Sequence, residues 1–263
     1  MNKARLIAIP FLPLAGLISL GVLHGQAPMS APVNTVAVAQ PVNAAALLQQ
    51  CSQALGRPTP SLGLVAQGQR ISSSQADPTR VTVKSLGGLS LRLEETTATG
   101  LEVRVAANGK GSVTRAGKKD ALPSTATTYF HLDHIPVFLC ESLPASWAVA
   151  LKGVERVNSD NVYHLSIVAA PTASRTSRVD QALSSLDLYI DVTTHLPVKT
   201  KALIFSPTNL TNRSDWETYY GDYRDVQGLK IAFHTTQYLS GLKVNEFIFD
   251  TIVVQPVSVT EFQ

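Results

Sequence analysis

The sequence is poor in the residues that most often mark a chemical function. Its 263 residues include only two cysteines, two methionines and two tryptophans, and charged residues make up 16% of the chain. The spacing of the two cysteines matches no zinc-ligand pattern, which argues against a zinc site built from them alone. The formal net charge is only +3 and there is no long run of Lys or Arg, so the composition also argues against nucleic-acid binding.

Catalytic motifs are missing as well. No Gly-x-Ser-x-Gly turn, glycine-rich phosphate loop, His-Glu-x-x-His helix or dinucleotide-binding fingerprint occurs in the sequence. His131 and His134 flank Asp133 and could ligate a metal, but no third ligand can be named, and surface or capping roles are commoner for such histidines. We therefore predict no catalytic residue, no metal site and no cofactor.

The first 27 residues have the features of a signal peptide. Lys3 and Arg5 precede an apolar run that ends at Leu23, and small residues follow this run. Cleavage is expected between residues 25 and 40, and the alternative is an uncleaved anchor helix. Neither cysteine follows a lipobox, which argues against an acyl anchor. The sequence thus predicts a secreted or periplasmic protein.

A linker and a single domain follow this leader. Residues 28–41 contain three prolines among small residues, which is typical of a linker. Residues 42–263 are enough for one domain with a good core. Because the leader carries Lys3 and Arg5 but no acidic residue, its removal lowers the formal charge from +3 to +1.

Two short helical segments are expected. The first covers residues 44–55, with Asn43 as its amino-terminal cap and Gly56 at its carboxyl-terminal turn. Its apolar stripe consists of Leu47, Leu48, Cys51, Ala54 and Leu55. The second covers Val137–Leu143 and begins near Pro136, because proline suits the first turn of a helix.

Alternation of apolar and polar residues predicts strands over most of the remaining chain. The expected strands are 62–71, 81–84, 89–94, 101–105, 147–157, 162–168, 186–192, 198–205, 216–226, 229–238 and 242–254. Gly87-Gly88 and Asn108-Gly109 are expected hairpin turns. Bulges are expected at Gly68 and near Asn245, where the apolar phase slips. The polar segments 117–127 and 206–215 are expected to be loops.

These elements predict an α+β protein with a mostly antiparallel sheet. Because the strands are apolar on one side only, the sheet needs helices, a second sheet or a bound apolar molecule to cover that side. In an oxidising compartment the pair Cys51 and Cys140 favours a disulfide, and the alternative is two buried free thiols. A bridge over so long a loop would stabilise the fold by about 4 kcal/mol on the chain-entropy account.

The last eighty residues resemble a known family. They read DLYIDVTTHLPVKTKALIF and then YYGDYRDVQGLKIAFHTTQYLSGLKVNEFIFDTIVV. This order of strands and turns resembles the outer-membrane lipoprotein-sorting carrier superfamily, the LolA/LolB-like proteins, and in particular its uncharacterised secreted bacterial members. The resemblance covers residues 186–263 well and 60–110 loosely, and the motifs that carry it are structural.

The resemblance implies a strongly curved antiparallel sheet, an unclosed half-barrel with short helices over its concave face. It also implies an apolar groove for acyl chains. The apolar residues that would line this groove are Leu89, Leu91, Leu93, Leu188, Ile190 and Phe233. The helices at 44–55 and 136–143 would be lid pieces, and a bridge between Cys51 and Cys140 would hold them together.

Arg92 is the expected lid contact under this resemblance, because the carrier family uses an arginine on an early strand to hold its lid. However, Arg92 points away from the side that Leu89, Leu91 and Leu93 share, and only one of the two sides can line the groove. The alternative is an exposed Arg92 in a cross-strand charge pair.

The predicted function is a non-enzymatic periplasmic binding protein for lipid or lipoprotein acyl chains. We expect a monomer that binds no nucleic acid and that also contacts an envelope protein. Two alternatives remain open at this point: a protein–protein interaction or sensor module of the same fold, and a hydrolase with an unrecognised site.

Overall fold

The computed structural model describes residues 43–263, except for residues 60, 89, 108–109, 123–135, 139, 141–146, 170–184 and 207–208. These residues belong to one compact unit, Pro41–Gln263. The predicted signal peptide and linker lie outside the described residues. So do Leu89 and the histidine pair His131 and His134.

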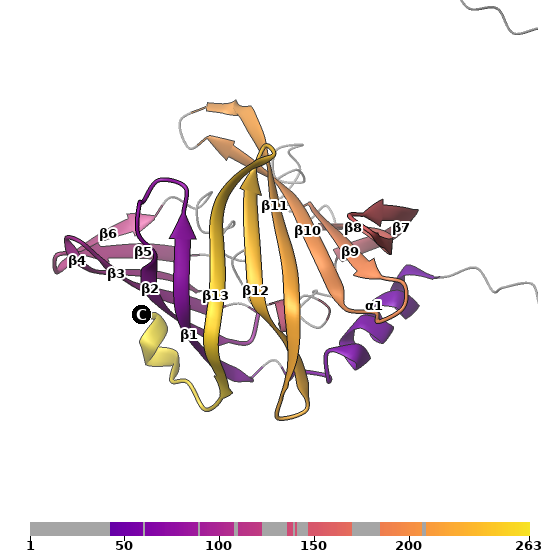
Figure 1. Ribbon diagram of the computed structural model, residues 1–263, viewed down its shortest axis with the longest axis horizontal. Helices are drawn as coiled ribbons and strands as arrows, with labels where there is room; N and C mark the ends of the chain where they lie inside the picture. Colours follow the sequence, from indigo (N-terminus) through magenta and orange to yellow (C-terminus); the bar gives the residue numbers. More distant parts are fainter. Residues whose placement is uncertain are drawn as a thin grey trace, which may run out of the picture. The chain divides into compact units, whose positions relative to one another are not determined.

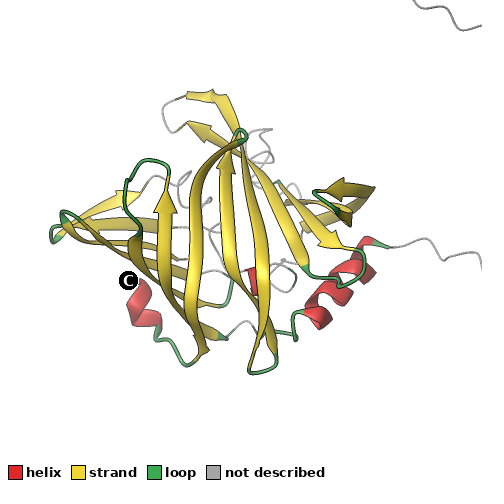
Figure 2. Ribbon diagram, viewed as in Figure 1, coloured by secondary structure: helices red, strands yellow, loops and turns green. Residues whose placement is uncertain are grey.

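A single antiparallel sheet of thirteen strands forms the described part of the domain (Figure 1 and Figure 2). The strands are β1 (Gly63–Ser72), β2 (Thr79–Leu86), β3 (Ser90–Thr97), β4 (Gly100–Ala107), β5 (Lys110–Arg115), β6 (Lys118–Leu122), β7 (Trp147–Val157), β8 (Asp160–Ala169), β9 (Leu186–Asp191), β10 (Pro197–Ser206), β11 (Asn209–Val226), β12 (Leu229–Leu239) and β13 (Leu242–Val254). The spatial order is β6-β5-β4-β3-β2-β1-β13-β12-β11-β10-β9-β8-β7. The sheet therefore consists of two meanders that meet where β1 pairs with β13.

The sheet does not close on itself, because β6 and β7 lie at its two opposite edges. Figure 1 shows the strand direction turning from β4 on one side, through β12 in the centre, to β8 on the other side. This progressive turn is the ordinary twist of a large antiparallel sheet. The predicted fold class, an α+β protein with an unclosed, mostly antiparallel half-barrel, is confirmed.

The two predicted bulges are present. The β1–β13 register shifts between Gln67 and Gly68, and the β12–β13 register shifts between Gln237 and Tyr238, opposite the Asn245 region. A Cβ atom at Gly68 would lie 2.1 Å from the Ile248 carbonyl oxygen, so only glycine fits this crossing point. The bulges keep the apolar residues of β13 on one side of the sheet although their spacing in the sequence changes.

Two segments predicted to be loops form strands instead. Residues 118–122, inside the expected loop 117–127, form the edge strand β6, and most of the expected loop 206–215 belongs to the β10–β11 hairpin. Both predictions were wrong for the same reason. Neither segment has an apolar alternation in the sequence, because residues 118–121 are exposed and residues 209–215 are mostly polar.

Helical elements cover parts of both sides of the sheet. The helix α1 (Ala44–Ala54) and the 3₁₀ turn η2 (Pro136–Phe138) pack on one side, which we call the inner face and which also bears Leu91 and Ile231. The carboxyl-terminal 3₁₀ turn η3 (Val259–Phe262) packs on the opposite side, the outer face, near β3 and β4. The second predicted helix thus begins at Pro136 as expected, and its described part is a 3₁₀ turn.

Candidate functional site

The helix α1 is capped at its amino-terminal end and joined to the sheet at its carboxyl-terminal end. Asn43 Oδ1 accepts a hydrogen bond from the Ala45 amide at 2.8 Å, which is the predicted amino-terminal cap. At the other end the Leu55 carbonyl accepts a hydrogen bond from the Lys230 amide at 3.1 Å, so the helix is joined to the start of β12. Leu47 and Leu55 are 1% and 0% exposed, and they point into the main apolar cluster.

A disulfide joins α1 to the segment after η2. Cys51 and Cys140 are bonded, with their Cα atoms 6.2 Å apart across a sequence separation of 89 residues. Val137 of η2 is fully buried, and η2 lies against β12. The predicted bridge between the two covering elements is therefore confirmed.

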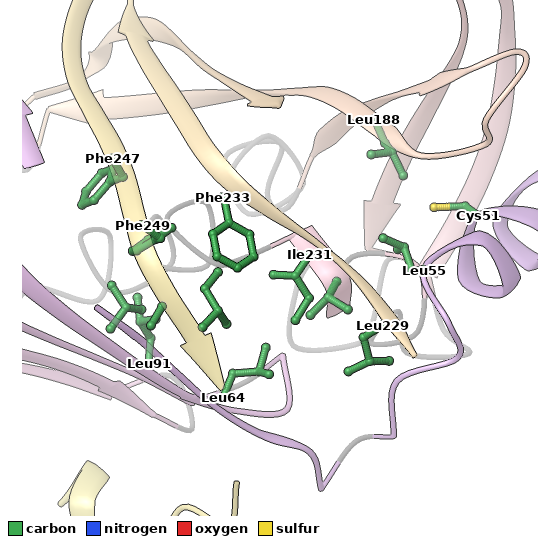
Figure 3. Close-up of a cluster of buried hydrophobic side chains, with 14 of the residues drawn as sticks. Cys51, Leu55, Leu64, Leu91, Leu188, Leu229, Ile231, Phe233, Phe247 and Phe249 are labelled. Carbon is green, nitrogen blue, oxygen red and sulfur yellow. The ribbon is translucent and has the colours of Figure 1, made fainter. Parts of the chain in front are cut away.

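The inner face carries one continuous apolar cluster, part of which Figure 3 shows. Five of the six predicted lining residues belong to it and are between 0% and 6% exposed: Leu91, Leu93, Leu188, Ile190 and Phe233. The sixth, Leu89, lies outside the described residues. Leu91 and Leu188 come from distant strands of the sheet, yet both point toward the same interior space (Figure 3). Their contact with a ligand stays a prediction.

Several residues of this face were not predicted as lining. They come from the centre of the sheet and from α1: Leu55, Leu64, Leu229, Ile231, Phe247, Phe249 and Ile252. The alternation of Leu229, Ile231 and Phe233 on β12 was visible in the sequence. Phe247 and Ile252 were harder to assign to one face, because the bulge opposite Gly68 changes the phase between them.

Arg92 lies on the outer face, opposite Leu91 and Leu93. Its Nε atom donates to Glu94 Oε1 at 2.5 Å, and its Nη1 atom donates to the Glu261 carbonyl at 3.1 Å. Among the described residues these contacts tie Arg92 to the carboxyl-terminal turn and not to α1 or η2. A lid contact for Arg92 stays a prediction that these contacts do not support.

A row of polar residues crosses the inner face through five neighbouring strands. The register pairs Ser72 of β1 with Asn245 of β13, Asn245 with Gln237 of β12, Gln237 with Thr218 of β11, and Thr218 with Thr200 of β10. We call these five residues the polar row. Asn245 Nδ2 donates to Gln237 Oε1 at 2.9 Å. Because directly paired residues share a face, the row divides the apolar surface from the β12–β13 turn.

A buried ion pair lies beside the polar row. Arg70 Nη2 donates to Glu95 Oε1 at 2.5 Å, and the two side chains are 11% and 2% exposed. Arg70 precedes Ser72 by two residues and Glu95 follows Leu93 by two, so both belong to the inner face. Among the described residues they are the only charged ones that are buried. The pair therefore adds hydrogen-bonding groups to the inner face without adding net charge.

Two tyrosines of β11 have hydrogen-bond partners on β10. Tyr220 OH lies 2.9 Å from Thr200 Oγ1, and Tyr223 OH donates to the Pro197 carbonyl at 2.7 Å. Burial raises the pKa of the Tyr223 phenol well above its usual value, so this hydroxyl stays protonated and remains a donor. Tyr220 and Tyr223 thus join β11 to β10.

On the outer face, ion pairs and stacked aromatic rings join neighbouring strands. His164 Nδ1 lies 2.6 Å from Glu155 Oε1, and its ring stacks on Tyr189. Lys199 Nζ donates to Glu217 Oε1 at 2.6 Å. Burial lowers the pKa of Lys199, but its hydrogen bonds to Glu217 and Tyr219 outweigh this effect and raise it overall. No three His, Cys, Asp or Glu side chains of the described segments are placed to hold a metal ion.

Three solved structures have the same fold. A LolA superfamily protein from Nitrosomonas europaea has a TM-score of 0.55 and 12% identity, and the match covers 85% of this chain and 98% of that chain. An outer membrane lipoprotein-sorting protein domain from Vibrio parahaemolyticus has a TM-score of 0.57 and 11% identity, with 84% and 97% covered. A DUF1329 family protein from Desulfovibrio piger has a TM-score of 0.55 and 9% identity, with 84% and 95% covered.

These likenesses concern the fold. The chain shares the architecture of the LolA superfamily, as the resemblance of residues 186–263 predicted. No protein-family model and no curated protein matches the sequence. Within the described ranges no helix has both the length and the apolar character that crossing a membrane requires.

Proposed function

We propose that this protein is a non-enzymatic, secreted or periplasmic binding protein that holds lipid or lipoprotein acyl chains against its inner face. One observation carries the proposal. The inner face of an unclosed sheet is apolar across strands as distant as β3 and β9, and a disulfide joins α1, which packs on that face, to Cys140. An apolar concave surface under a small tethered cover suits an extended hydrocarbon chain.

The disulfide and the leader support the proposed compartment. A bond between Cys51 and Cys140 is stable in an oxidising environment such as the periplasm, and residues 1–27 read as an export signal. The fold shared with lipoprotein-sorting domains agrees with this location. Export is tested by fractionating cells that express the full chain and by sequencing the amino terminus of the mature protein.

Binding is tested by titrating the purified, oxidised protein with diphenylhexatriene, a hydrocarbon that fluoresces in apolar surroundings. We expect saturable uptake with about one site, because the ligand needs only apolar surface. Phe233→Glu places a charge in the apolar cluster and should abolish uptake. Leu242→Glu is the matched control, since Leu242 is 74% exposed, and it should bind as the wild type does.

Folding of both variants is checked by thermal unfolding, and Phe233→Ala replaces Phe233→Glu if the charged variant does not fold. The absence of saturable uptake by the folded wild-type protein would reject the proposal and favour an interaction module of the same fold. Light scattering and a nucleic-acid mobility shift test two further predictions, namely that the protein is a monomer and that it does not bind nucleic acid.

A further inference from the structure

The polar row contains hydrogen-bonding groups that the fold leaves unused. Thr218 is 0% exposed, and its Oγ1 atom has no hydrogen-bond partner among the residues that the structure describes. Trp216 lies two residues earlier on β11 and on the same face, and its buried Nε1 atom likewise lacks a partner there. Leaving buried polar atoms unpaired costs stability, so two of them together on one strand call for a ligand.

The chemistry of these atoms restricts what can bind. The indole Nε1–H can only donate, and a hydroxyl can donate to an acceptor on the same ligand. The group that satisfies both must therefore carry acceptor oxygens. A carboxylate or phosphate would also need a positive partner, but Arg70, the one buried cation of the described residues, lies on β1 and its charge is balanced by Glu95, although its Nε atom has no partner. The fitting group is an uncharged acceptor, of which an ester carbonyl is the simplest.

The position of the row agrees with this chemistry. On β12, Gln237 of the row lies near the β12–β13 turn, whereas Phe233, Ile231 and Leu229 follow toward α1 (Figure 1 and Figure 3). From Gln237 to Ile231 the strand extends about 20 Å. A ligand with one polar end and one long chain can thus place its polar end on the row and its chain on the apolar cluster.

We propose that Thr218 and Trp216 bind the ester carbonyl of an acylglycerol group, and that the polar row thereby orients the ligand with its acyl chain toward α1. This inference rests on the proposed function and makes it more specific. The same ester group occurs in free glycerolipids and on acylated cysteines of lipoproteins, so the experiment uses one probe of each kind.

The test compares the wild type with Thr218→Val, which removes the hydroxyl and keeps the branched shape. Three ligands are titrated: diphenylhexatriene, monooleoylglycerol, and a peptide with an S-diacylglyceryl cysteine at its amino terminus. Loss of one hydrogen bond should weaken binding of an ester ligand about three- to ten-fold. Binding of diphenylhexatriene should not change, because this hydrocarbon has no acceptor.

The two ester probes distinguish a free glycerolipid from an acylated lipoprotein as the source of the ester group. A weaker affinity for monooleoylglycerol assigns the row to a free glycerolipid, and a weaker affinity only for the peptide assigns it to an acylated protein terminus. Equal affinities of wild type and variant for both ester probes would overturn the inference while leaving the proposed function intact. If diphenylhexatriene itself does not bind, the proposed function fails first.

A stability measurement separates ligand binding from a structural role. Because the Thr218 hydroxyl is buried and unpaired, Thr218→Val should raise the Tm of the ligand-free protein by about 2–4 °C. A hydroxyl with a structural role would give the opposite sign, and a lowered Tm would contradict the inference. Thr82→Val, on the outer face of β2, is the control. It should change neither the affinities for the two ester ligands nor the ranking of the three ligands by affinity.

Trp216→Phe provides a second, independent variant. It removes the Nε1 donor and keeps an aromatic ring on the same face of β11. Monooleoylglycerol or peptide binding should again fall about three- to ten-fold, with diphenylhexatriene binding retained. Ionised oleate should bind the wild type more weakly than monooleoylglycerol does. A preference for oleate would overturn the assignment of an uncharged group.

Discussion

Neighbouring residues of β3 point to opposite faces of the sheet and have opposite chemistry. Leu91 and Leu93 are 1% and 3% exposed on the inner face, whereas Arg92 and Glu94 form an ion pair on the outer face. The inner face buries apolar side chains, and its only buried charges among the described residues belong to the pair Arg70–Glu95. The outer face carries ion pairs such as Lys84–Glu261. The comparison indicates that the inner face supplies the stability and that the outer face supplies solubility.

The sharpest test of this contrast uses one ion pair from each face. Arg70→Met leaves Glu95 buried without a partner, which should lower the free energy of unfolding by about 3–5 kcal/mol. Arg80 and Asp250 form a pair whose side chains are 73% and 56% exposed, so Arg80→Met should cost less than about 1 kcal/mol. Urea unfolding of both variants measures the difference. Equal losses would show that the two faces do not differ as described.

The disulfide joins the cover of the inner face to the rest of the domain and closes a long loop. Replacement of Cys51 and Cys140 by alanine should lower the free energy of unfolding by about 4 kcal/mol, because the closed loop is long. Diphenylhexatriene uptake should persist at low temperature, since the sheet that carries the apolar cluster remains. Chemical denaturation with and without reductant measures the same quantity in the wild type, and a stability unchanged by reductant would contradict the assigned bridge.

Truncation of single apolar residues sharpens the comparison further. Ile231 is 0% exposed at the centre of the inner face, so Ile231→Ala should cost about 3 kcal/mol through lost burial and the cavity left behind. Val154 on β7 is 60% exposed, and Val154→Ala should change stability by no more than about 0.5 kcal/mol. Thermal and urea unfolding compare the two. A costly Val154→Ala would indicate that this exposed residue is covered by a partner.

The smallest effect is expected from the outer-face carboxylate Glu246. Hydrogen bonds from Lys243 lower its pKa against the opposing effect of burial, and His234 lowers it further. A carboxyl with a lowered folded-state pKa contributes stability above its unfolded pKa and loses it as the pH falls through the folded pKa. Glu246→Gln should therefore cost less than about 1 kcal/mol at pH 7. The difference from the wild type should disappear below the lowered pKa in an acid titration of stability.

The sequence predicted well those elements that have one buried face. The bounds Trp147–Val157 and Leu242–Val254 agree with β7 and β13, because period-two alternation directly reflects burial on one side. The pairing of Cys51 with Cys140 followed from the even cysteine count and the expected compartment. Strands in segments 118–122 and 209–215 were predicted as loops, because these segments lack a period-two apolar alternation.

The polar row could not be predicted from the sequence. Thr218 and Gln237 look like solvent-facing residues when each strand is read alone, and only the register across five strands places them in one line on the inner face. The two bulges made this harder, because each shifts the phase of β13 relative to its neighbours. Arg92 lies on the outer face and contacts the carboxyl-terminal turn, and its role as a lid contact stays a prediction.

The pairing of β1 with β13 also has a consequence for the folding of the newly synthesised chain. The first strand of the sheet pairs with the last, so almost the whole domain must be synthesised before β1 can pair with its second neighbour. Contacts this distant along the chain form slowly. Until they form, the backbone groups on one side of β1 stay open to any other extended segment, and aggregation of newly synthesised chains should begin at this strand.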